Sequence, residues 1–385
     1  MYKIKMLNKI SNVGVDTLDK EKYTVAEDIS DPDAILVRSA DMHDYIFNPE
    51  LLCIARAGAG TNNIPSDKCR EEGIVVFNTP GANANAVKEM VICALFMASR
   101  DILGGIEWVK SLGADIDVAQ AVEKGKSAYV GPEISGKTLG VVGLGAIGAK
   151  IANAATRLGM KVYGYDPYLS VDAAWNLSAD IIHATDLEAI YKNCDYITLH
   201  VPYMEATHHL INERALGMMK KDVRIINIAR GELVNDDDMI AAIHSGKVAR
   251  YVTDFPNNKI VNIEGIIAIP HLGASTPESE DNCAVMAARE IVEYIENGNI
   301  INSVNMPSAS LPRTGDPRIC IIHKNVPGMI AKITGAISAC NINIENMLNS
   351  GAKDMYAIID VNSVAEGLEE TIKAIEGVVR VRVLK

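Results

Sequence analysis

Apolar and polar positions alternate along residues 1 to about 98 in a pattern typical of strands followed by helices. Two continuous apolar runs, 34–37 and 74–77, predict buried strands. Residues 65–72 predict a helix between turns, closed by Gly73, and apolar residues recur at helical spacing over 85–100. Strands and helices that alternate in this way indicate a parallel sheet.

A second series of apolar runs begins near Gly136. We expect strands at 138–142, 161–166, 196–200, 224–228, 249–253 and 266–269, with helical stretches between them. This order favours a doubly wound sheet. A long helix over 277–297, ended by Gly298, would carry the chain back to the first domain.

The chain ends in a smaller unit of different pattern. Residues 307–317 hold three prolines and one glycine and predict a linker. After it we expect a strand (318–323), a helix (328–340), strands (342–349 and 354–361), a helix (364–376) and a strand (379–384). The order βαββαβ is the ferredoxin-like topology.

Charge and composition narrow the class of protein. The net charge of −12 gives no general attraction for nucleic acid or anionic membranes. The N-terminus lacks the apolar core of a signal peptide, and no run of 18 apolar residues occurs. The seven cysteines are scattered without a Cys-x-x-Cys pair, so we expect free thiols in a reducing cytoplasm and no metal site.

The sequence Gly143-Leu-Gly145-Ala-Ile-Gly148 follows a predicted strand and precedes a helical stretch at 147–158. In such a loop the glycines allow a tight turn, close approach of a pyrophosphate, and close packing of helix on strand. Asp166 ends the next strand, 18 residues after Gly148, where it would bind ribose hydroxyls and repel a 2′-phosphate. The motif therefore predicts NAD rather than NADP.

Two side chains at strand ends suit oxidation of a hydroxyl group. Arg230 follows the strand 224–228 and could hold a carboxylate with two parallel hydrogen bonds. His271 follows the strand 266–269 and could take up and return a proton near neutral pH. Ligands of open α/β sheets gather at the carboxyl ends of strands, so we expect both residues at one site.

Residues 1 to about 306 resemble the D-isomer-specific 2-hydroxyacid dehydrogenase family. The resemblance rests on the glycine motif, on His200-Val-Pro202 with Thr207, on residues 227–231 and on residues 270–276. It implies that Arg230 binds the substrate carboxylate and that His271 is the acid/base. It also implies cofactor contacts from Gly143, Gly145, Ala146, Ile147, Gly148, Asp166, His200, Val201, Pro202, Thr207, Ala229, Arg230, Asp254, His271, Gly273 and Ala274.

Motifs in the first domain resemble those of the 3-phosphoglycerate dehydrogenases within that family. They are residues 37–39, 56–58 and 78–83. The resemblance implies that 3-phosphoglycerate is the substrate and that it is bound by Arg38, Ser39, Arg56 and Asn83 besides Arg230. Arg38, Ser39 and Arg56 would hold the phosphate end.

One part of the family pattern is missing. The family usually has a glutamate that bonds the catalytic histidine, and the matching position here falls on Asn258 or Lys259. Neither is an acid. Asp254 matches the aspartate that meets the nicotinamide amide, and Glu264 is a possible substitute partner for His271. The third catalytic residue stays unassigned at this point.

Residues 317–385 resemble an ACT domain, a small amino-acid-sensing module. His323-Lys-Asn325-Val-Pro-Gly328 lies at the first turn from strand to helix, and Asn343 begins the second strand. The resemblance implies that His323, Asn325 and Asn343 bind L-serine as an effector between paired domains. It also suggests a homodimer or homotetramer.

The fold class we expect is α/β, with three parts. A flavodoxin-like substrate domain takes residues 1–98 and 275–306, a Rossmann-type NAD-binding domain takes 99–274, and the ferredoxin-like ACT domain takes 317–385 after a linker at 307–316. The reaction expected is oxidation of 3-phospho-D-glycerate with NAD. A glyoxylate or hydroxypyruvate reductase, another D-2-hydroxyacid dehydrogenase, and a corepressor-like scaffold that senses NAD remain open as alternatives.

Overall fold

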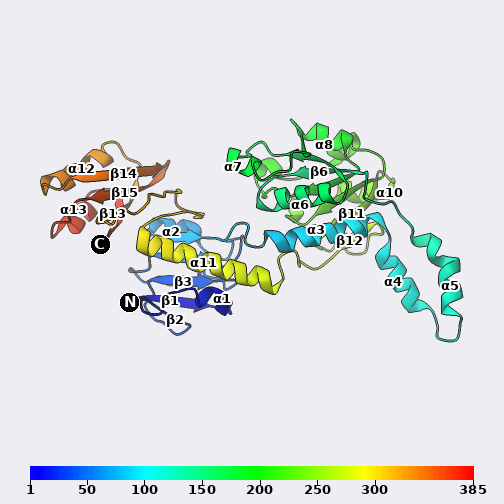
Figure 1. Ribbon diagram of the computed structural model, residues 1–385, viewed down its shortest axis with the longest axis horizontal. Coiled ribbons are helices and arrows are strands. Elements are labelled where there is room, and N and C mark those ends of the chain that lie inside the picture. The colour runs from blue at the N-terminus through cyan, green and yellow to red at the C-terminus, as the bar shows by residue number, and fades with distance from the viewer. The chain divides into compact units, whose positions relative to one another are not determined.

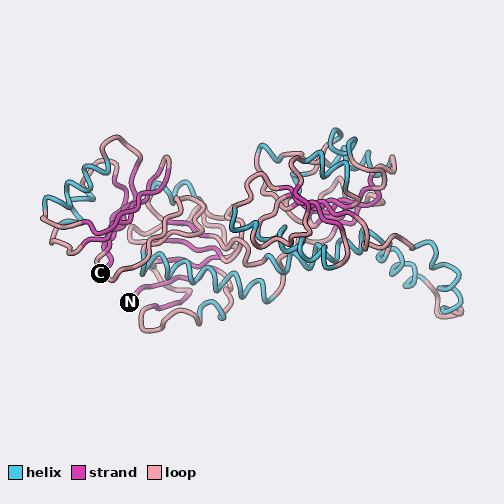
Figure 2. The backbone as a smooth tube through the Cα atoms, turned by 45° about the horizontal axis from the view of Figure 1, so that its top comes forward, coloured by secondary structure: helices cyan, strands magenta, loops and turns pink.

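A computed structural model describes residues 1–385, apart from the side chain of Asp172. The described strands form three sheets, which Figure 2 shows as three groups of magenta segments. The chain divides into two compact units, 1–83 with 277–385, and 84–276. The helix that follows Asn83 thus belongs to the second unit. The predicted α/β fold class is confirmed.

The first unit begins with a parallel sheet in the order β2-β1-β3-β4-β5, as expected for a flavodoxin-like domain. Its strands are β1 (Tyr2–Leu7), β2 (Tyr23–Ala26), β3 (Ala34–Val37), β4 (Cys53–Arg56) and β5 (Val75–Phe77). The helices of this part are α1 (Asn12–Val15), α2 (Ser66–Glu71) and α11 (Pro277–Asn297). The yellow helix α11 lies beside these strands in Figure 1 and buries nine of its residues.

The C-terminal part of this unit has the predicted order βαββαβ. It consists of β13 (Arg318–Lys324), α12 (Met329–Ala339), β14 (Ile344–Gly351), β15 (Asp354–Val361), α13 (Leu368–Lys373) and β16 (Val378–Leu384). The antiparallel sheet has the order β14-β15-β13-β16. The ferredoxin-like prediction is therefore confirmed.

Alternation along β13 gives this sheet two apolar faces. Ile319 and Ile321 belong to a core with α12 and α13, whereas Cys320 and Ile322 join the core that contains α11. Gly298 ends α11 so close to β13 that a Cβ there would lie 2.3 Å from Cys320 Sγ. The C-terminal sheet is thus packed into the first unit and shares its core.

The second unit holds a parallel sheet in the order β12-β11-β10-β9-β6-β7-β8. Its strands are β6 (Thr138–Val142), β7 (Lys161–Tyr165), β8 (Ile182–His183), β9 (Tyr196–Leu199), β10 (Val223–Asn227), β11 (Val248–Thr253) and β12 (Ile266–Ala268). The chain order reverses between β6 and β9, which is where doubly wound sheets bind ligands. The predicted strands agree with these bounds to within one residue.

Helices of the second unit connect and cover these strands. They are α3 (Ala84–Ser99), α6 (Ala146–Arg157), α7 (Val171–Ala174), α8 (Leu187–Asn193), α9 (Glu213–Met218) and α10 (Asp236–His244), with short 3₁₀ turns η2 (Glu205–Thr207) and η3 (Gly231–Leu233). No helix among the described residues is long and apolar enough to cross a membrane.

A helical arm, residues 102–129, projects from this unit and was not predicted. It contains α4 (Ile102–Ser111), α5 (Val118–Gly125) and the 3₁₀ turn η1 (Lys126–Tyr129), drawn in cyan in Figure 1. Trp108 stacks on Tyr129 at 5.3 Å, yet none of these three elements has a buried residue. The arm therefore contributes no core to its own unit.

Candidate functional site

The glycine turn lies between β6 and α6, at the reversal of strand order. Gly143 has a positive φ of 91°, and a Cβ at Gly148 would lie 1.9 Å from the carbonyl oxygen of Gly143. A Cβ at Gly145 would meet no atom within 4 Å, so this glycine borders open space. The helix α6 begins directly after it without a side-chain cap. These features fit a pyrophosphate lying against the free N–H groups of the first turn.

Asp166 follows β7 and holds the glycine turn from the other side. Its Oδ2 accepts a hydrogen bond from the Leu144 N–H at 2.9 Å, and its Oδ1 accepts one from the Tyr168 N–H at 2.9 Å. The structure thus brings the predicted ribose-binding carboxylate beside the turn. Tyr168 is exposed, and no arginine follows Asp166 that could receive a 2′-phosphate.

The predicted residues 200–207 form one loop after β9. Thr207 Oγ1 donates to the Pro202 carbonyl at 2.8 Å and accepts from the Met204 N–H at 2.8 Å. These two bonds close the loop. His200 contacts Thr198 Oγ1 through Nε2 at 2.8 Å, and its Nδ1 is buried without a partner. Burial lowers the pKa of His200 to about 3, so the ring is neutral at neutral pH.

Asn227 shapes the loop that carries Arg230. Its fully buried side chain donates from Nδ2 to the Arg230 carbonyl at 2.8 Å and accepts at Oδ1 from the Ala229 N–H at 3.2 Å. The Arg230 guanidinium stays exposed and donates to the Ala229 carbonyl at 2.6 Å. Asn227 was absent from the predicted site residues, although it opens the motif 227–231 on which the resemblance rests.

Asp254 is the carboxylate that lies within electrostatic reach of both predicted catalytic residues. It follows β11 and is 1% exposed. Burial raises the pKa of Asp254, while the charges of His271 and Arg230 and the Gly273 N–H act in the opposite direction. Oδ2 lies 3.4 Å from the Gly273 nitrogen, and Oδ1 is buried without a partner. An orphaned acceptor of this kind fits the amide of a nicotinamide.

The position of the missing glutamate contains no substitute acid. Lys259 forms an exposed ion pair with Asp237 at 2.8 Å. The suggested replacement, Glu264, is exposed and precedes β12, whereas His271 follows that strand. The two residues therefore lie toward opposite ends of β12. The His271 ring instead packs against Phe255 with ring centroids 4.8 Å apart.

The predicted phosphate-binding residues lie at the carboxyl ends of β3 and β4 in the first unit. Arg56 Nε donates to the Arg38 carbonyl at 3.0 Å, so the structure brings the two arginines together. The Arg38 guanidinium pairs with Glu280 at 2.7 Å. The Ser39 N–H donates to Asn8 Oδ1 at 3.2 Å, and Asn83 closes the loop after β5.

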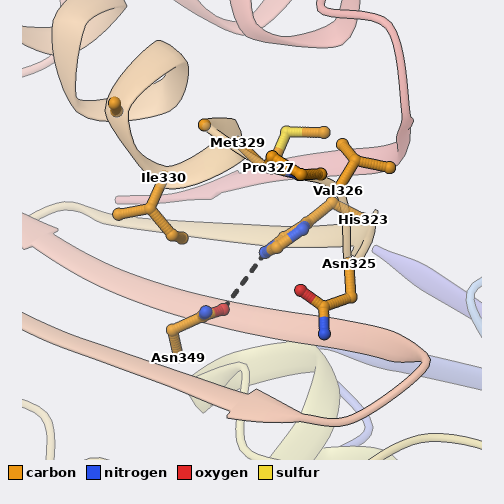
Figure 3. A pocket seen from close by; sticks show the side chains of 9 residues that line it. His323, Asn325, Val326, Pro327, Met329, Ile330 and Asn349 are labelled. Atoms are coloured by element: carbon orange, nitrogen blue, oxygen red, sulfur yellow. Dashed lines mark hydrogen bonds between the residues drawn. The ribbon is translucent and has the colours of Figure 1, made fainter.

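A pocket of about 400 Å³ lies at the junction of β13 and α12 (Figure 3). His323 and Asn325, both predicted effector ligands, line it together with residues 326–331 at the start of α12. The His323 ring is fixed, because Nδ1 lies 2.9 Å from the Lys324 carbonyl oxygen and Nε2 lies 3.1 Å from Asn349 Oδ1. Three polar side chains, His323, Asn325 and Asn349, thus face the pocket together with apolar residues at the start of α12.

Asn343 and Asn349 differ from what the sequence indicated. Asn343 does not line the pocket; its side chain donates to Glu345 at 2.8 Å. Asn349, which was not predicted, lies on β14 and does line it. The register of β14 on β15 and of β15 on β13 places Gly351 in line with His323, and Asn349 two residues away on the same face. The period of two along β14 was the one available signal.

Residues 92–273 match the family model of the D-isomer specific 2-hydroxyacid dehydrogenase NAD-binding domain. The D-3-phosphoglycerate dehydrogenase of Haemophilus influenzae is 32% identical over 350 residues, which cover 87% of this chain and 82% of that relative. The chain belongs to the D-isomer-specific 2-hydroxyacid dehydrogenase family. Residues 92–273 are therefore the NAD-binding domain of that family.

Other relatives extend beyond the aligned region. The D-3-phosphoglycerate dehydrogenases of Bacillus subtilis and Methanocaldococcus jannaschii are 32% and 33% identical over 326 and 322 residues. The matches cover 80% and 81% of this chain but only 60% and 59% of those relatives. The chain thus spans about three fifths of the length of these two proteins.

Solved structures agree on the fold. The NAD+-bound 3-phosphoglycerate dehydrogenase of Entamoeba histolytica has a TM-score of 0.61 at 26% identity and covers 79% of this chain and 98% of its own. The holo D-mandelate dehydrogenase of Rhodotorula graminis has a TM-score of 0.67 at 23% identity, with coverage of 81% and 99%. The second likeness supports the fold alone.

Proposed function

We propose that the chain oxidises 3-phospho-D-glycerate to 3-phosphooxypyruvate with NAD, the first step of the phosphorylated route to L-serine. The observation that carries this proposal is the grouping of Arg230, Asp254 and His271 just after the carboxyl ends of β10, β11 and β12, respectively. The names of the relatives that are 31–33% identical support the substrate.

Each residue would have a distinct task in this reaction. The glycine turn, Asp166 and Asp254 would hold NAD, which when bound would supply the acceptor for the hydride. His271 takes the hydroxyl proton on an imidazole nitrogen, and Arg230 orients the substrate by its carboxylate. Asp254 would stabilise the imidazolium that forms at His271, because an opposite charge nearby favours the charged form. Arg38, Ser39 and Arg56 would hold the phosphate.

We infer further that L-serine regulates the enzyme through the pocket of His323 and Asn325. The backbone N–H groups at the start of α12 suit the carboxylate of serine. The side-chain amides of Asn325 and Asn343 suit its ammonium and hydroxyl groups. Asn343 would contribute to this site from a paired subunit, in a homodimer or homotetramer of the cytoplasmic enzyme. Asn349 is a fourth side chain available to the ligand.

NADH formation at 340 nm with 3-phosphoglycerate, with and without serine, tests the proposal. In the variant Arg38→Ala we expect the KM for 3-phosphoglycerate to rise at least about tenfold, the value of one lost charge-assisted contact. The matched control is Arg289→Ala, which removes an exposed arginine on α11. Turnover of glyoxylate or hydroxypyruvate with no effect of Arg38→Ala would favour a reductase instead, and no turnover at all would favour a scaffold.

A further inference from the structure

The hairpin between β14 and β15 connects the effector pocket to the flavodoxin-like domain. Asn325 lines the pocket and also holds the turn of this hairpin: its Nδ2 donates to the Ala352 carbonyl at 2.6 Å, and its backbone N–H donates to the Lys353 carbonyl at 3.2 Å. A ligand that forms a hydrogen bond with the Asn325 side-chain amide competes with the bond from Asn325 to Ala352. Ligand binding and release of the hairpin turn are therefore coupled at one side chain.

Asp354 follows that turn and joins it to α2. Its carboxylate lies 2.6 Å from Lys324 Nζ and 3.3 Å from Arg70 Nε, and the side chain is only 9% exposed. Arg70 lies on α2 and also pairs with Asp67 at 2.9 Å. Because the carboxylate is largely withdrawn from water, salt screens the contact with Arg70 less than it would screen a surface ion pair.

The C-terminal end of α2, where Arg70 also lies, is held by a second residue of the C-terminal sheet. The Arg380 guanidinium on β16 donates to the carbonyls of Leu51 at 2.8 Å, Pro49 at 3.1 Å and Glu72 at 3.2 Å. From Glu72 the chain passes through the fully buried strand β5 into residues 78–83, which include the predicted substrate residue Asn83. A displacement of α2 would therefore be passed to this loop through a short, buried strand.

We propose that Asp354 is the positioning residue through which occupancy of the pocket reaches α2 and the loop 78–83. Without ligand, Asn325 holds the turn and Asp354 holds Arg70. With ligand, the amide leaves Ala352, the turn relaxes and the contact of Asp354 with Arg70 is lost. The ligand thus interacts differently with two arrangements of one element, which is what coupling of two sites requires. The inhibition part rests on the proposed function.

Two measurements on the full chain test this route. In Arg70→Gln we expect serine to bind more tightly than in the parent by calorimetry, because binding no longer has to break the contact with Asp354, while its maximal inhibition of NADH formation falls to less than half. Without serine the variant should already turn over more slowly than the parent, because it lacks the contact that serine would break. Arg70→Lys, which keeps the charge, retains more inhibition than Arg70→Gln. A Kd and an inhibition that both match the parent would overturn the proposal.

Hydrogen exchange gives a readout that needs neither serine nor turnover. Asn325→Ala permanently removes the side-chain bond to Ala352 and loosens the turn, so amides of residues 66–77 should exchange faster than in the parent. The control Lys22→Gln breaks a 2.8 Å ion pair with Glu296 in the same unit, away from the hairpin, and should leave that segment unchanged. Unaltered exchange at 66–77 in Asn325→Ala would refute the route. Absence of serine binding by the parent, with faster exchange in Asn325→Ala, would refute only the proposed effector.

Discussion

Glu290 is a buried carboxyl group whose ionisation opposes folding. It lies on α11, is 5% exposed, and accepts one hydrogen bond at Oε1 from Asn302 Nδ2 at 2.6 Å. Its Oε2 is buried without a partner. Burial raises the pKa of Glu290 from 4.5 to about 7, against the smaller effect of Asn302. The folded protein therefore favours the protonated acid.

The sign and size of the effect follow from linkage. Between pH 4.5 and 7 the unfolded chain has lost the proton that the folded chain keeps, so the free energy of unfolding falls as pH rises through this window and is level above it. A shift of this size is worth about 3 kcal/mol in total, of which about 2.5 kcal/mol develops between pH 5 and pH 8.

Glu290→Gln isolates this contribution, because the amide keeps the acceptor for Asn302 but does not titrate. The amide changes the free energy of unfolding by a constant that does not depend on pH. Beyond that constant, we expect the free energy of unfolding of the variant, relative to the parent, to rise by about 2.5 kcal/mol between pH 5 and pH 8. For a unit of this size that corresponds to roughly 5–10 °C in Tm. Thermal unfolding at both pH values measures it.

Glu278→Gln is the control, since it changes an exposed glutamate in the first turn of the same helix. Its effect on Tm should be small at both pH values. If Glu290→Gln shifted Tm equally at pH 5 and pH 8, the carboxyl group would not titrate in that window and the reasoning from burial would be wrong.

Four further predictions concern the cofactor turn, the proton acceptor, the phosphate site and a buried ion pair. Gly148→Ala should destabilise the second unit, because its Cβ would lie 1.9 Å from the Gly143 carbonyl, whereas Gly145→Ala should fold and only weaken NADH binding in a fluorescence titration; equal stability of both would contradict this. His271→Asn should lower kcat by about 10²–10⁴ with little change in NADH affinity; near-normal turnover would remove His271 from the mechanism. Glu280→Gln frees Arg38 from a half-exposed ion pair and should lower the KM for 3-phosphoglycerate by up to about fivefold; a raised KM would speak against a phosphate role for Arg38. Arg318→Met leaves Asp360 buried and unpaired, and should cost about 3–5 kcal/mol in denaturant unfolding; a cost below 1 kcal/mol would show that the pair is not sealed from water.

Local pattern was sufficient for most of the fold. The bounds predicted for α11, 277–297, match the structure, because its apolar face has a helical period and the helix is bounded by Pro277 and Gly298. The strands that were predicted in the parallel sheets are mostly continuous apolar runs, since helices cover both of their faces, whereas β1, β2, β4 and β8 were not predicted.

The helical arm was missed for a related reason. Its apolar side chains, among them Ile106 and Val109, are 46% and 44% exposed and do not point into a core of their own unit. A prediction that identifies helices by their buried face has no signal for such an element. Its helices begin at Asp101 and Asp117, whose side chains accept hydrogen bonds from Gly104 and Gln120, and these N-caps were the available clue.

Contacts between distant residues set the limit for the candidate site. Asp254 was expected to meet the cofactor, but its closeness to His271 depends on the neighbouring ends of β11 and β12. Likewise, Asn349 reaches His323 only through the order of three strands. A single sequence shows which residue types lie at the ends of predicted strands. It does not show which strands are neighbours in the sheet, and this decides which of those residues meet.

The core that β13 shares with α11 limits which segments of this chain can be deleted without exposing apolar surface. Regulatory modules on flexible tethers can be cut off or exchanged, but here the sheet that would be removed covers Tyr294 and Ile291 and supplies the arginine that stacks on Tyr294, with Arg382 4.5 Å from the ring. A truncated enzyme ending before Arg318 would present that helix surface to solvent. Deletion would thus confound loss of the proposed regulation with loss of solubility, so point variants are the appropriate test of that proposal.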